Sequence, residues 1–372
     1  MKKLGFGCMR LPLINEKDET SIDESMFSKM VDHFLEEGFT YFDTAYMYHE
    51  FKSELYVKKC LVERHKRDEF LLADKLPIIY LEKVGDQERF FDEQLQKTGA
   101  TYFDYYLLHN LNSNTYPKAV KFDSFAFCLG KKHEGKIKNL GFSFHDSPEL
   151  LEEILTAHPE VDFVQLQINY IDWESANIQS RKCYEVASKH NKKVIVMEPI
   201  KGGGLVALPE SALKIYKDYN PDISIASWAI RFAASLPNVF MVLSGMSNYD
   251  QLLDNTSYMK DFKVLNSNES KCIDEVVAIL NQNNIIACTK CRYCIEGCVK
   301  SIPIPDYFAL YNEEKKSLNK LFSTHGMYYR NLAATHGKAS ECIACHKCEK
   351  SCPQHLHIVD LLKEVARIFE EE

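Results

Sequence analysis

The sequence lacks an apolar run long enough to cross a membrane. A membrane-spanning helix needs about 20 consecutive apolar residues, and charged residues interrupt every apolar stretch of this 372-residue chain well before that length. The first residues, MKKLGFGCMRLPL, start with lysines but have neither the long apolar segment nor the small-residue cleavage site of a secretory signal. We therefore expect a cytoplasmic protein without a membrane partner.

An excess of positive charge is also absent. The 45 Lys and Arg residues are outnumbered by 53 Asp and Glu residues, which gives a net charge of −8. Nucleic acids are polyanions that select basic surfaces, so we expect no nucleic-acid partner. The acidity belongs to residues 1–287, because the residues from Cys288 onward carry 12 basic and 11 acidic side chains.

Cysteine, in contrast, is abundant, with 13 residues. In a reducing compartment these side chains are thiols or metal ligands rather than disulfides. Five of them stand singly among apolar neighbours and are interpreted as core thiols, namely Cys8, Cys60, Cys128, Cys183 and Cys272. The other eight form two ladders with the spacing C-x2-C-x2-C-x3-C, namely Cys288, Cys291, Cys294 and Cys298, and then Cys342, Cys345, Cys348 and Cys352.

The two ladders predict two [4Fe–4S] clusters. Three thiolates at every third position can surround one face of a compact iron–sulfur cube, while the fourth cysteine lies beyond their reach. Structural zinc is the alternative. Zinc ribbons, however, place paired C-x2-C knuckles about 15–20 residues apart and have no third and fourth cysteine in each ladder. The spacing therefore favours iron–sulfur clusters.

From Cys288 to Pro353 the tail resembles bacterial-type two-cluster ferredoxins. In those proteins the fourth cysteine of each ladder ligates the other cluster. The resemblance implies one cluster on Cys288, Cys291, Cys294 and Cys352, and a second on Cys342, Cys345, Cys348 and Cys298. The 43 residues between the ladders must then fold back so that the ladders meet.

Residues 4–258 alternate between short apolar stretches and longer segments with helical periodicity. Strands are expected at Leu4–Met9, Thr40–Phe42, Phe70–Ala73, Tyr105–Leu108, Ile137–Phe142, Phe163–Gln167, Lys193–Met197 and Val239–Leu243. Helices are expected to begin near Asp23, Lys52, Leu81, Ala119, Ser147, Ser175, Ser211 and Asn248. Eight such repeats predict a (β/α)8 barrel, or TIM barrel. A doubly wound sheet is the alternative, but Gly5-Phe6-Gly7 lacks the third glycine of its nucleotide-binding fingerprint.

The sequence predicts three parts. The barrel takes residues 1–258, a helical connector takes residues 259–286, and a small α-rich, ferredoxin-like domain takes residues 287–372. Helical periodicity over Asn268–Gln282 and Ile358–Phe369 predicts a connecting helix and a terminal helix.

Four polar side chains fall at the predicted ends of three successive strands. Asp43 and Tyr48 follow the second strand, Lys75 the third and His109 the fourth. A barrel carries its chemistry at these strand ends. A phenol with a pKa of about 10 is a poor acid, but a neighbouring ammonium lowers that pKa. A carboxylate can hold the ammonium, and a histidine can orient the carbonyl that receives the proton.

These residues, with Gly5–Arg10 and Leu107-Leu108-His109, resemble the aldo-keto reductase superfamily over residues 1–258. The resemblance implies that Tyr48 is the general acid, that Lys75 and Asp43 lower its pKa, and that His109 orients a small carbonyl substrate. It also implies an NADPH or NADH cofactor that lies extended across the barrel mouth.

The same resemblance indicates where the nucleotide would bind. Ser143 and Gln165 match positions that hold the nicotinamide amide, whereas Phe144 replaces an Asn, and Met197 or Glu198 replaces the ring-stacking aromatic residue. The remaining implied contacts are Gly202 and Gly203 with the pyrophosphate, and Gly245, Ser247, Gln251 and Asn255 with the adenosine. An Arg that grips the 2′-phosphate often stands at position 251, so NADP and NAD both remain open.

Because two of the residues that would contact the nicotinamide differ from the family pattern, a flavin is an alternative cofactor. A nicotinamide transfers a hydride, which carries two electrons, whereas each [4Fe–4S] cluster takes one electron. The two cofactors therefore do not exchange electrons directly. We consider three functions. The first is an iron–sulfur oxidoreductase whose clusters relay electrons, with a ferredoxin or flavoprotein partner. The others are an electron-transfer protein with a vestigial barrel site, and a carbonyl reductase with structural clusters.

Overall fold

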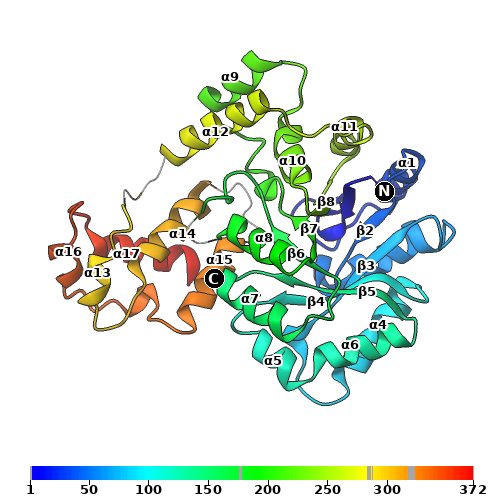
Figure 1. Cartoon of the computed structure of the whole chain (residues 1–372), viewed down its shortest axis with the longest axis horizontal. Helices are drawn as coiled ribbons and strands as arrows, with labels where there is room; N and C mark the ends of the chain where they lie inside the picture. Colours follow the sequence, from blue (N-terminus) through cyan, green and yellow to red (C-terminus); the bar gives the residue numbers. More distant parts are fainter. Residues whose placement is uncertain (1, 176–177, 283–285, 287, 317–322, 372) are drawn as a thin grey trace.

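Eight parallel strands close into a barrel in this computed structural model, which describes residues 2–175, 178–282, 286, 288–316 and 323–371 (Figure 1). Each strand pairs with its neighbours in the sequence, and β1 closes the barrel on β8. The strands are β1 (Leu4–Gly7), β2 (Tyr41–Asp43), β3 (Leu71–Leu76), β4 (Phe103–Leu111), β5 (Ile137–Phe144), β6 (Phe163–Gln167), β7 (Lys193–Met197) and β8 (Val239–Ser244). The predicted barrel is confirmed.

Helices follow the strands as the repeat predicts. They are α1 (Glu24–Glu36), α2 (Tyr48–Phe51), α3 (Ser53–Val57), α4 (Asp86–Thr98), α5 (Tyr116–Lys121), α6 (Ser124–His133), α7 (Pro148–Ala157), α8 (Ser180–Lys189), α9 (Glu210–Tyr219), α10 (Ile225–Ser235) and α11 (Tyr249–Met259). Two expected starts are five residues too early. The helix expected from Leu81 begins at Asp86, because Gly85 adopts a φ of +92° that an ordinary helical residue avoids. The helix expected from Ser175 begins at Ser180, directly after Gln179, which has a φ of +54°.

The barrel interior holds a core of its own, formed by Tyr41, Ala73, Leu107, Phe163, Ile195, Met241 and Leu243. Side chains alternate along a strand, so the residue two positions later points the same way. A larger apolar cluster fills the space between the strands and the surrounding helices. The interior core thus ends one layer below the C-terminal ends of the strands, where polar side chains take over.

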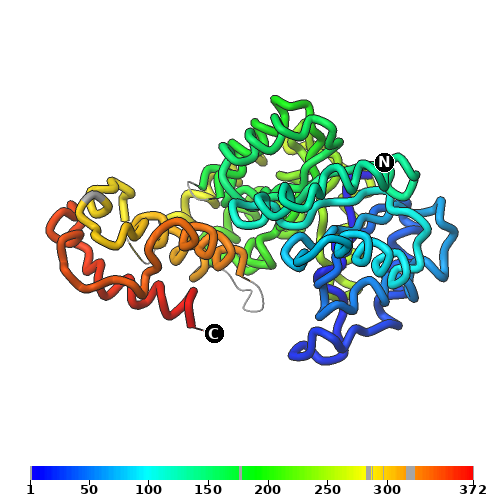
Figure 2. Tube along the Cα trace, turned by 90° about the horizontal axis from the view of Figure 1, so that it is seen from below, coloured from blue at the N-terminus to red at the C-terminus, as the bar shows by residue number. Residues whose placement is uncertain are grey.

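The rest of the chain is helical. It contains α12 (Ser267–Gln282), α13 (Tyr293–Glu296), α14 (Ile304–Lys316), α15 (Thr324–Ala333), α16 (Lys347–Lys350) and α17 (Ile358–Phe369). Helix α12 packs on α9 through Ile273 and Val276. The helices after it form a lobe beside the barrel (Figure 2). Among the described residues, no helix is both long and apolar enough to span a membrane.

Close packing between β5 and β6 explains a glycine inside a strand. A Cβ on Gly141 would lie 2.6 Å from the Phe163 carbonyl oxygen and 2.7 Å from its ring. We expect Gly141→Ala to lower the free energy of unfolding by about 1–3 kcal/mol, since the backbone must shift.

The matched control is Gly130→Ala. Gly130 lies in α6, and an added Cβ there meets nothing within 4 Å. This variant should gain about 0.5–1 kcal/mol from helix propensity. Thermal unfolding of the two purified variants measures both effects, and equal melting midpoints would contradict the packing argument.

Candidate active site and cysteine cavities

Lys75 lies at the centre of the predicted catalytic group. Its Nζ donates hydrogen bonds to Asp43 Oδ1 at 2.6 Å, to the Thr44 carbonyl oxygen at 2.7 Å and to the Tyr48 hydroxyl oxygen at 3.3 Å. An ammonium has three protons to donate, so this one is fully satisfied. Lys75 and Asp43 are only 1 % and 2 % exposed.

Strand register brings these groups together. Tyr41, Ala73 and Leu107 point into the barrel core, and Asp43, Lys75 and His109 stand two positions later on the same three strands. The predicted residues therefore form the next layer up, at the barrel mouth. The rings of Tyr48 and His109 meet edge to face, with their centres 6.0 Å apart. Both side chains keep partial exposure, as a substrate contact requires.

Burial and charge set the protonation states. Burial and the Asp43 carboxylate raise the pKa of Tyr48, and the Lys75 ammonium only partly opposes that rise. The pKa of Tyr48 therefore lies above its usual value, whereas the resemblance implied that Lys75 and Asp43 would lower it. Burial alone would lower the pKa of Lys75, but Asp43 and Tyr48 hold it above its usual value. Burial, Lys75 and His145 together place the pKa of His109 well below its usual range. At neutral pH the site therefore holds a protonated phenol, an ammonium and a neutral imidazole.

A strained turn follows Tyr48. Residues His49, Glu50 and Phe51 have φ values of 51°, 49° and 69°, and each left-handed residue costs roughly 1–2 kcal/mol. The buried His49 ring holds the turn. Its Nε2 accepts the Leu11 N–H at 3.1 Å, and its Nδ1 lies 2.8 Å from the Glu19 carbonyl oxygen. The sequence analysis did not single out His49, although it directly follows Tyr48.

The two predicted amide-binding residues lie beside this group. Ser143 Oγ accepts the Asn110 N–H at 2.7 Å. Gln165 Nε2 lies 3.5 Å from Asp43 Oδ2. Gln165 Oε1 is buried and has no hydrogen-bond partner in the described part of the chain. An unsatisfied buried acceptor next to the predicted catalytic tetrad (Asp43, Tyr48, Lys75 and His109) fits the N–H groups of a nicotinamide carboxamide.

The other predicted nucleotide contacts are spread around the mouth. Met197 ends β7 and is partly exposed. Gly202 and Gly203 form a tight turn with φ values of 64° and 98°, and the Gly203 N–H already bonds to the Ile200 carbonyl. Gly245 follows β8 and is exposed.

Near the start of α11, the side chains of three further predicted contacts bond to the protein itself. Gln251 Oε1 accepts the Ser247 N–H at 2.8 Å, and Ser247 Oγ donates to the Arg10 carbonyl oxygen at 3.2 Å. The Asn255 side chain is buried and bonds to Ser244 Oγ at 2.9 Å and to the Tyr258 hydroxyl at 2.6 Å. Both ends of Asn255 are thus used inside the protein, whereas Gln251 and Ser247 remain exposed.

The eight ladder cysteines line two cavities, grouped as the sequence predicts. The first cysteine cavity has about 310 Å³ of space, part of it open to solvent, and is lined by Cys288, Cys291, Cys294 and Cys352. The second cysteine cavity has about 350 Å³ and is lined by Cys298, Cys342, Cys345 and Cys348. The fourth cysteine of each ladder therefore crosses to the other cavity. This donor set fits two iron–sulfur clusters.

The ladders also repeat each other in backbone conformation. In the first ladder, Lys290, Arg292 and Ser301 have positive φ values, and in the second ladder Ala344, His346 and His355 do. These residues stand at equivalent positions, since 54 residues separate each pair. Among the described residues, no three His, Cys, Asp or Glu side chains converge as ligands of a single metal ion.

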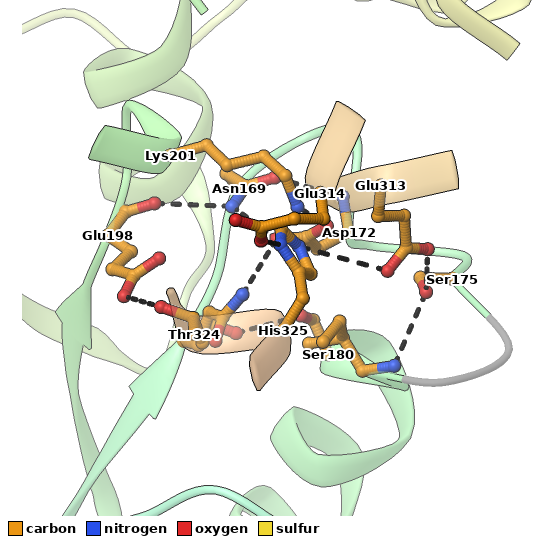
Figure 3. Close-up of polar contacts among 12 residues, drawn as sticks. Asn169, Asp172, Ser175, Ser180, Glu198, Lys201, Glu313, Glu314, Thr324 and His325 are labelled. Carbon is orange, nitrogen blue, oxygen red and sulfur yellow. Dashed lines mark hydrogen bonds and ion pairs between the residues drawn. The ribbon is translucent and has the colours of Figure 1, made fainter. Parts of the chain in front are cut away.

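Helices α14 and α15 join this tail to the barrel mouth through half-buried polar contacts (Figure 3). Thr324 at the start of α15 donates to the carboxylate of Glu198, which follows β7. Ser175, after β6, donates to Glu313 of α14 at 2.9 Å. Within the tail, His325 Nδ1 lies 2.8 Å from Glu314 Oε2. The tail is thus docked on the loops after β6 and β7.

A buried ion pair supports this interface. Asp172 and Lys201, from the same two loops, are 1 % and 7 % exposed and bond to each other. Burial would raise the pKa of Asp172, but Lys201 and His325 hold it below its usual value. Asp172 also accepts from Gln167 at 2.8 Å and from Asn169 at 2.7 Å. No sequence pattern marks this pair, because Asp172 and Lys201 lie 29 positions apart in two separate loops.

We expect Lys201→Met to destabilise the protein by about 3–5 kcal/mol, because it leaves a buried carboxylate without its partner. The Asp172 carboxyl has a lowered pKa, so its contribution is present above the unfolded-state pKa of about 3.9 and is lost as the pH falls through the folded-state value. The loss in the variant should therefore be large at pH 7 and smaller in strong acid.

Lys214→Met is the matched control. Lys214 pairs with Asp218 on the surface, where their side chains are 71 % and 63 % exposed, so its loss should change stability by less than about 1 kcal/mol. Thermal unfolding midpoints at several pH values compare the two variants. Equal midpoints at pH 7 would show that the Asp172–Lys201 pair does not stabilise the fold.

Comparison with known proteins agrees with this geometry. The profile of the aldo/keto reductase family matches residues 3–278, and the profile of a 4Fe-4S dicluster domain matches residues 287–360. A probable aldo-keto reductase 1 from Glycine max is 30 % identical over 188 residues, which cover 46 % of this chain and 49 % of that protein. The chain thus spans about half the length of this curated relative.

Solved structures show the same barrel. An aldo-keto reductase from Bacillus halodurans in its holo form has a TM-score of 0.59 and 23 % identity, and covers 74 % of this chain and 91 % of that one. An aldo-keto reductase from Klebsiella pneumoniae in complex with NADPH has a TM-score of 0.57 and 18 % identity, with 74 % and 90 % covered. Since the family profile spans more than half of the chain, the protein belongs to the aldo/keto reductase family and carries a 4Fe-4S dicluster domain after its barrel.

Proposed function

We propose that the protein is a cytoplasmic iron–sulfur oxidoreductase that reduces a small carbonyl compound at the barrel mouth with NADPH or NADH, while its clusters relay electrons. The observation that carries the proposal is the hydrogen-bonded series from Asp43 through Lys75 to Tyr48, beside the neutral His109. This is the arrangement that a proton donor to a carbonyl oxygen requires.

In this proposal, each polar group has one task. Tyr48 gives its proton to the carbonyl oxygen, and the Lys75 ammonium stabilises the phenolate that remains. Asp43 keeps Lys75 charged and in place, and neutral His109 donates a hydrogen bond that orients the carbonyl. A bound NADPH or NADH would supply the hydride to the carbonyl carbon, which becomes an alcohol carbon. Gln165 and Ser143 would hold the carboxamide of that cofactor.

The cysteine cavities would hold two [4Fe–4S] clusters in a domain of residues 287–372, which a connector of residues 259–286 joins to the barrel of residues 1–258. Helix α14 links the cavities to the mouth, because Ile304 and Phe308 line the first cysteine cavity and Glu313 reaches Ser175. The ten residues from Ile304 to Glu313 are nine helical steps, which span roughly 14 Å. Relay between a hydride and one-electron clusters needs a flavin, bound here or on a ferredoxin-linked or flavoprotein partner.

A second candidate, a carbonyl reductase with structural clusters, is favoured by one observation. Helices α14 and α15 lie in the segment between the two ladders, so ligation of Cys298 and Cys342 would fix both ends of the segment that docks on the barrel. In that case the clusters hold the mouth in shape and exchange no electrons with it.

We expect Tyr48→Phe to lower kcat for carbonyl reduction by about 10²–10⁴-fold, because it removes the general acid. Binding of NADPH should change little, since the ring remains. The matched control is Tyr46→Phe, whose hydroxyl bonds to Glu93 at 3.1 Å rather than to Lys75. NADPH oxidation with a panel of aldehydes measures both, and unchanged kcat in Tyr48→Phe would reject Tyr48 as the proton donor.

The role of the clusters is tested on protein purified without oxygen. Two clusters predict about eight iron and eight sulfide per chain, and a flavin assay shows whether the mediator is bound. If the clusters relay electrons, NADPH or NADH bleaches their visible absorption. Carbonyl reduction without bleaching, lost together with the tail fold in Cys345→Ser, would support the structural role instead.

A further inference from the structure

We infer that α15 and His145 together form an outer wall of the substrate site, and that this wall selects carbonyl compounds with a second oxygen function on the adjacent carbon. This inference rests on the proposed carbonyl reduction. It assigns part of the substrate site to the iron–sulfur domain, and it assigns a binding role to a histidine that the tetrad does not include.

Helix α15 presents one face to the barrel. Thr324, Tyr328 and Asn331 are separated by four and three residues, so they share that face. Thr324 bonds to Glu198 after β7. Asn331 Nδ2 donates to the His145 carbonyl oxygen at 3.1 Å, and its Oδ1 accepts from Asn114 at 2.9 Å. Ten residues of helix, about 15 Å long, are thus anchored at both ends across the mouth.

Tyr328 lies between these anchors and meets His145. Their rings are edge to face, with centres 6.4 Å apart, and Tyr328 is buried. The contacts in Figure 3 hold the N-terminal end of the helix in place, because Thr324 and His325 bond to Glu198 and Glu314. The position of Tyr328 against His145, at the edge of the apolar core of the tail, is therefore fixed rather than variable.

His145 directly follows β5, two positions after Ser143. Phe144 between them packs into the outer core. The His145 N–H bonds to the Leu111 carbonyl at 3.1 Å, and its carbonyl bonds to Asn331. The backbone is thus held on both sides. The ring is different, because its buried Nδ1 has no hydrogen-bond partner among the described residues.

The His145 ring shares its surroundings with His109. It helps to lower the pKa of His109, and the Nδ1 of His109 is likewise buried without a partner among the described residues. Two imidazoles, each with a buried Nδ1 that has no partner among the described residues, therefore lie near each other at the ends of β4 and β5. One can take the reacting carbonyl oxygen, and the other is placed for an oxygen on the next carbon.

Charge decides which oxygen function fits. Burial lowers the pKa of His145 to about 4, so the ring is neutral at pH 7. A neutral imidazole has one donor and one acceptor and pairs with a hydroxyl or carbonyl group. It offers no positive charge to a carboxylate or phosphate. An α-hydroxy or α-keto carbonyl compound meets these requirements, and a simple alkyl aldehyde or ketone leaves the ring unpaired.

Hydroxyacetone and butanone test this directly, since they differ only by a hydroxyl in place of a methyl group. We expect the holoprotein to prefer hydroxyacetone in kcat/KM by about 10–100-fold, the range for a site built to bind a hydroxyl. His145→Leu should abolish the preference by raising KM for hydroxyacetone, with butanone changed by less than about 3-fold. His145→Asn, which keeps a donor and an acceptor, should restore part of it.

Helix α15 is tested by two neighbouring tyrosines. Tyr328→Ala removes the wall and should raise kcat/KM for the bulkier 2-hydroxyacetophenone relative to hydroxyacetone by about 10-fold or more. Tyr329→Phe is the control, because the Tyr329 hydroxyl bonds to Glu370 and to the Ala339 N–H inside the iron–sulfur domain. It should leave that ratio unchanged. This second test also holds if His145→Leu fails to fold.

The failures are distinguishable. Equal kcat/KM for the two small ketones in the wild type, or an equal loss for both in His145→Leu, overturns the role of His145 and leaves the proposed function standing. An unchanged ratio in Tyr328→Ala overturns the role of α15. Absence of NADPH or NADH oxidation with every carbonyl compound overturns the proposed function, and this inference with it.

Discussion

A charged lysine inside the barrel is the constraint on which the site depends. An ammonium that is taken out of water must be surrounded by an anion and hydrogen-bond acceptors, and Lys75 finds them in Asp43, Thr44 and Tyr48. These partners come from β2 and the turn after it. Three features therefore serve to stabilise the buried Lys75 ammonium: the pairing of β2 with β3, the burial of Asp43 and the strained turn after Tyr48. The turn keeps its conformation because both ring nitrogens of His49 are hydrogen-bonded.

The cysteine ladders impose a second constraint, at longer range. Because Cys298 and Cys352 each cross to the cavity of the other ladder, the chain between the ladders must fold back so that the ladders meet. This segment carries α14 and α15, which share the apolar core of the lobe and also bond to the loops after β5, β6 and β7. The same segment that closes the iron–sulfur domain thus covers one side of the barrel mouth, which makes the two domains a single catalytic unit in our proposal.

The sequence was sufficient wherever the information is local. Strand positions follow from short apolar stretches, and the closeness of Asp43, Lys75 and His109 follows from strand ends that share one rim. The crossed cysteine grouping joins distant residues, and it was implied by the resemblance to two-cluster ferredoxins rather than by a local pattern. The sequence was insufficient where a contact joins distant segments. His145 and His49 look like ordinary histidines until their partners from α15 and from the loop at Leu11 are known. The sequence feature that could have pointed to His145 is its position two residues after Ser143, a predicted cofactor contact. Asn255 matched a family position, yet Tyr258 and Ser244 occupy its side chain.

The crossed grouping of the cysteines affects the order in which the parts of the chain can fold during synthesis. Cys288 and Cys352 share a cavity but are 64 residues apart, and every barrel strand is synthesised before either of them. A chain that grows at roughly 5–20 residues per second can fold its barrel several seconds before the first cavity has all four thiols. During that interval the newly made barrel has an uncovered mouth. The mouth is covered on this side only after α15 has been synthesised, because this helix begins 80 residues after the end of β8.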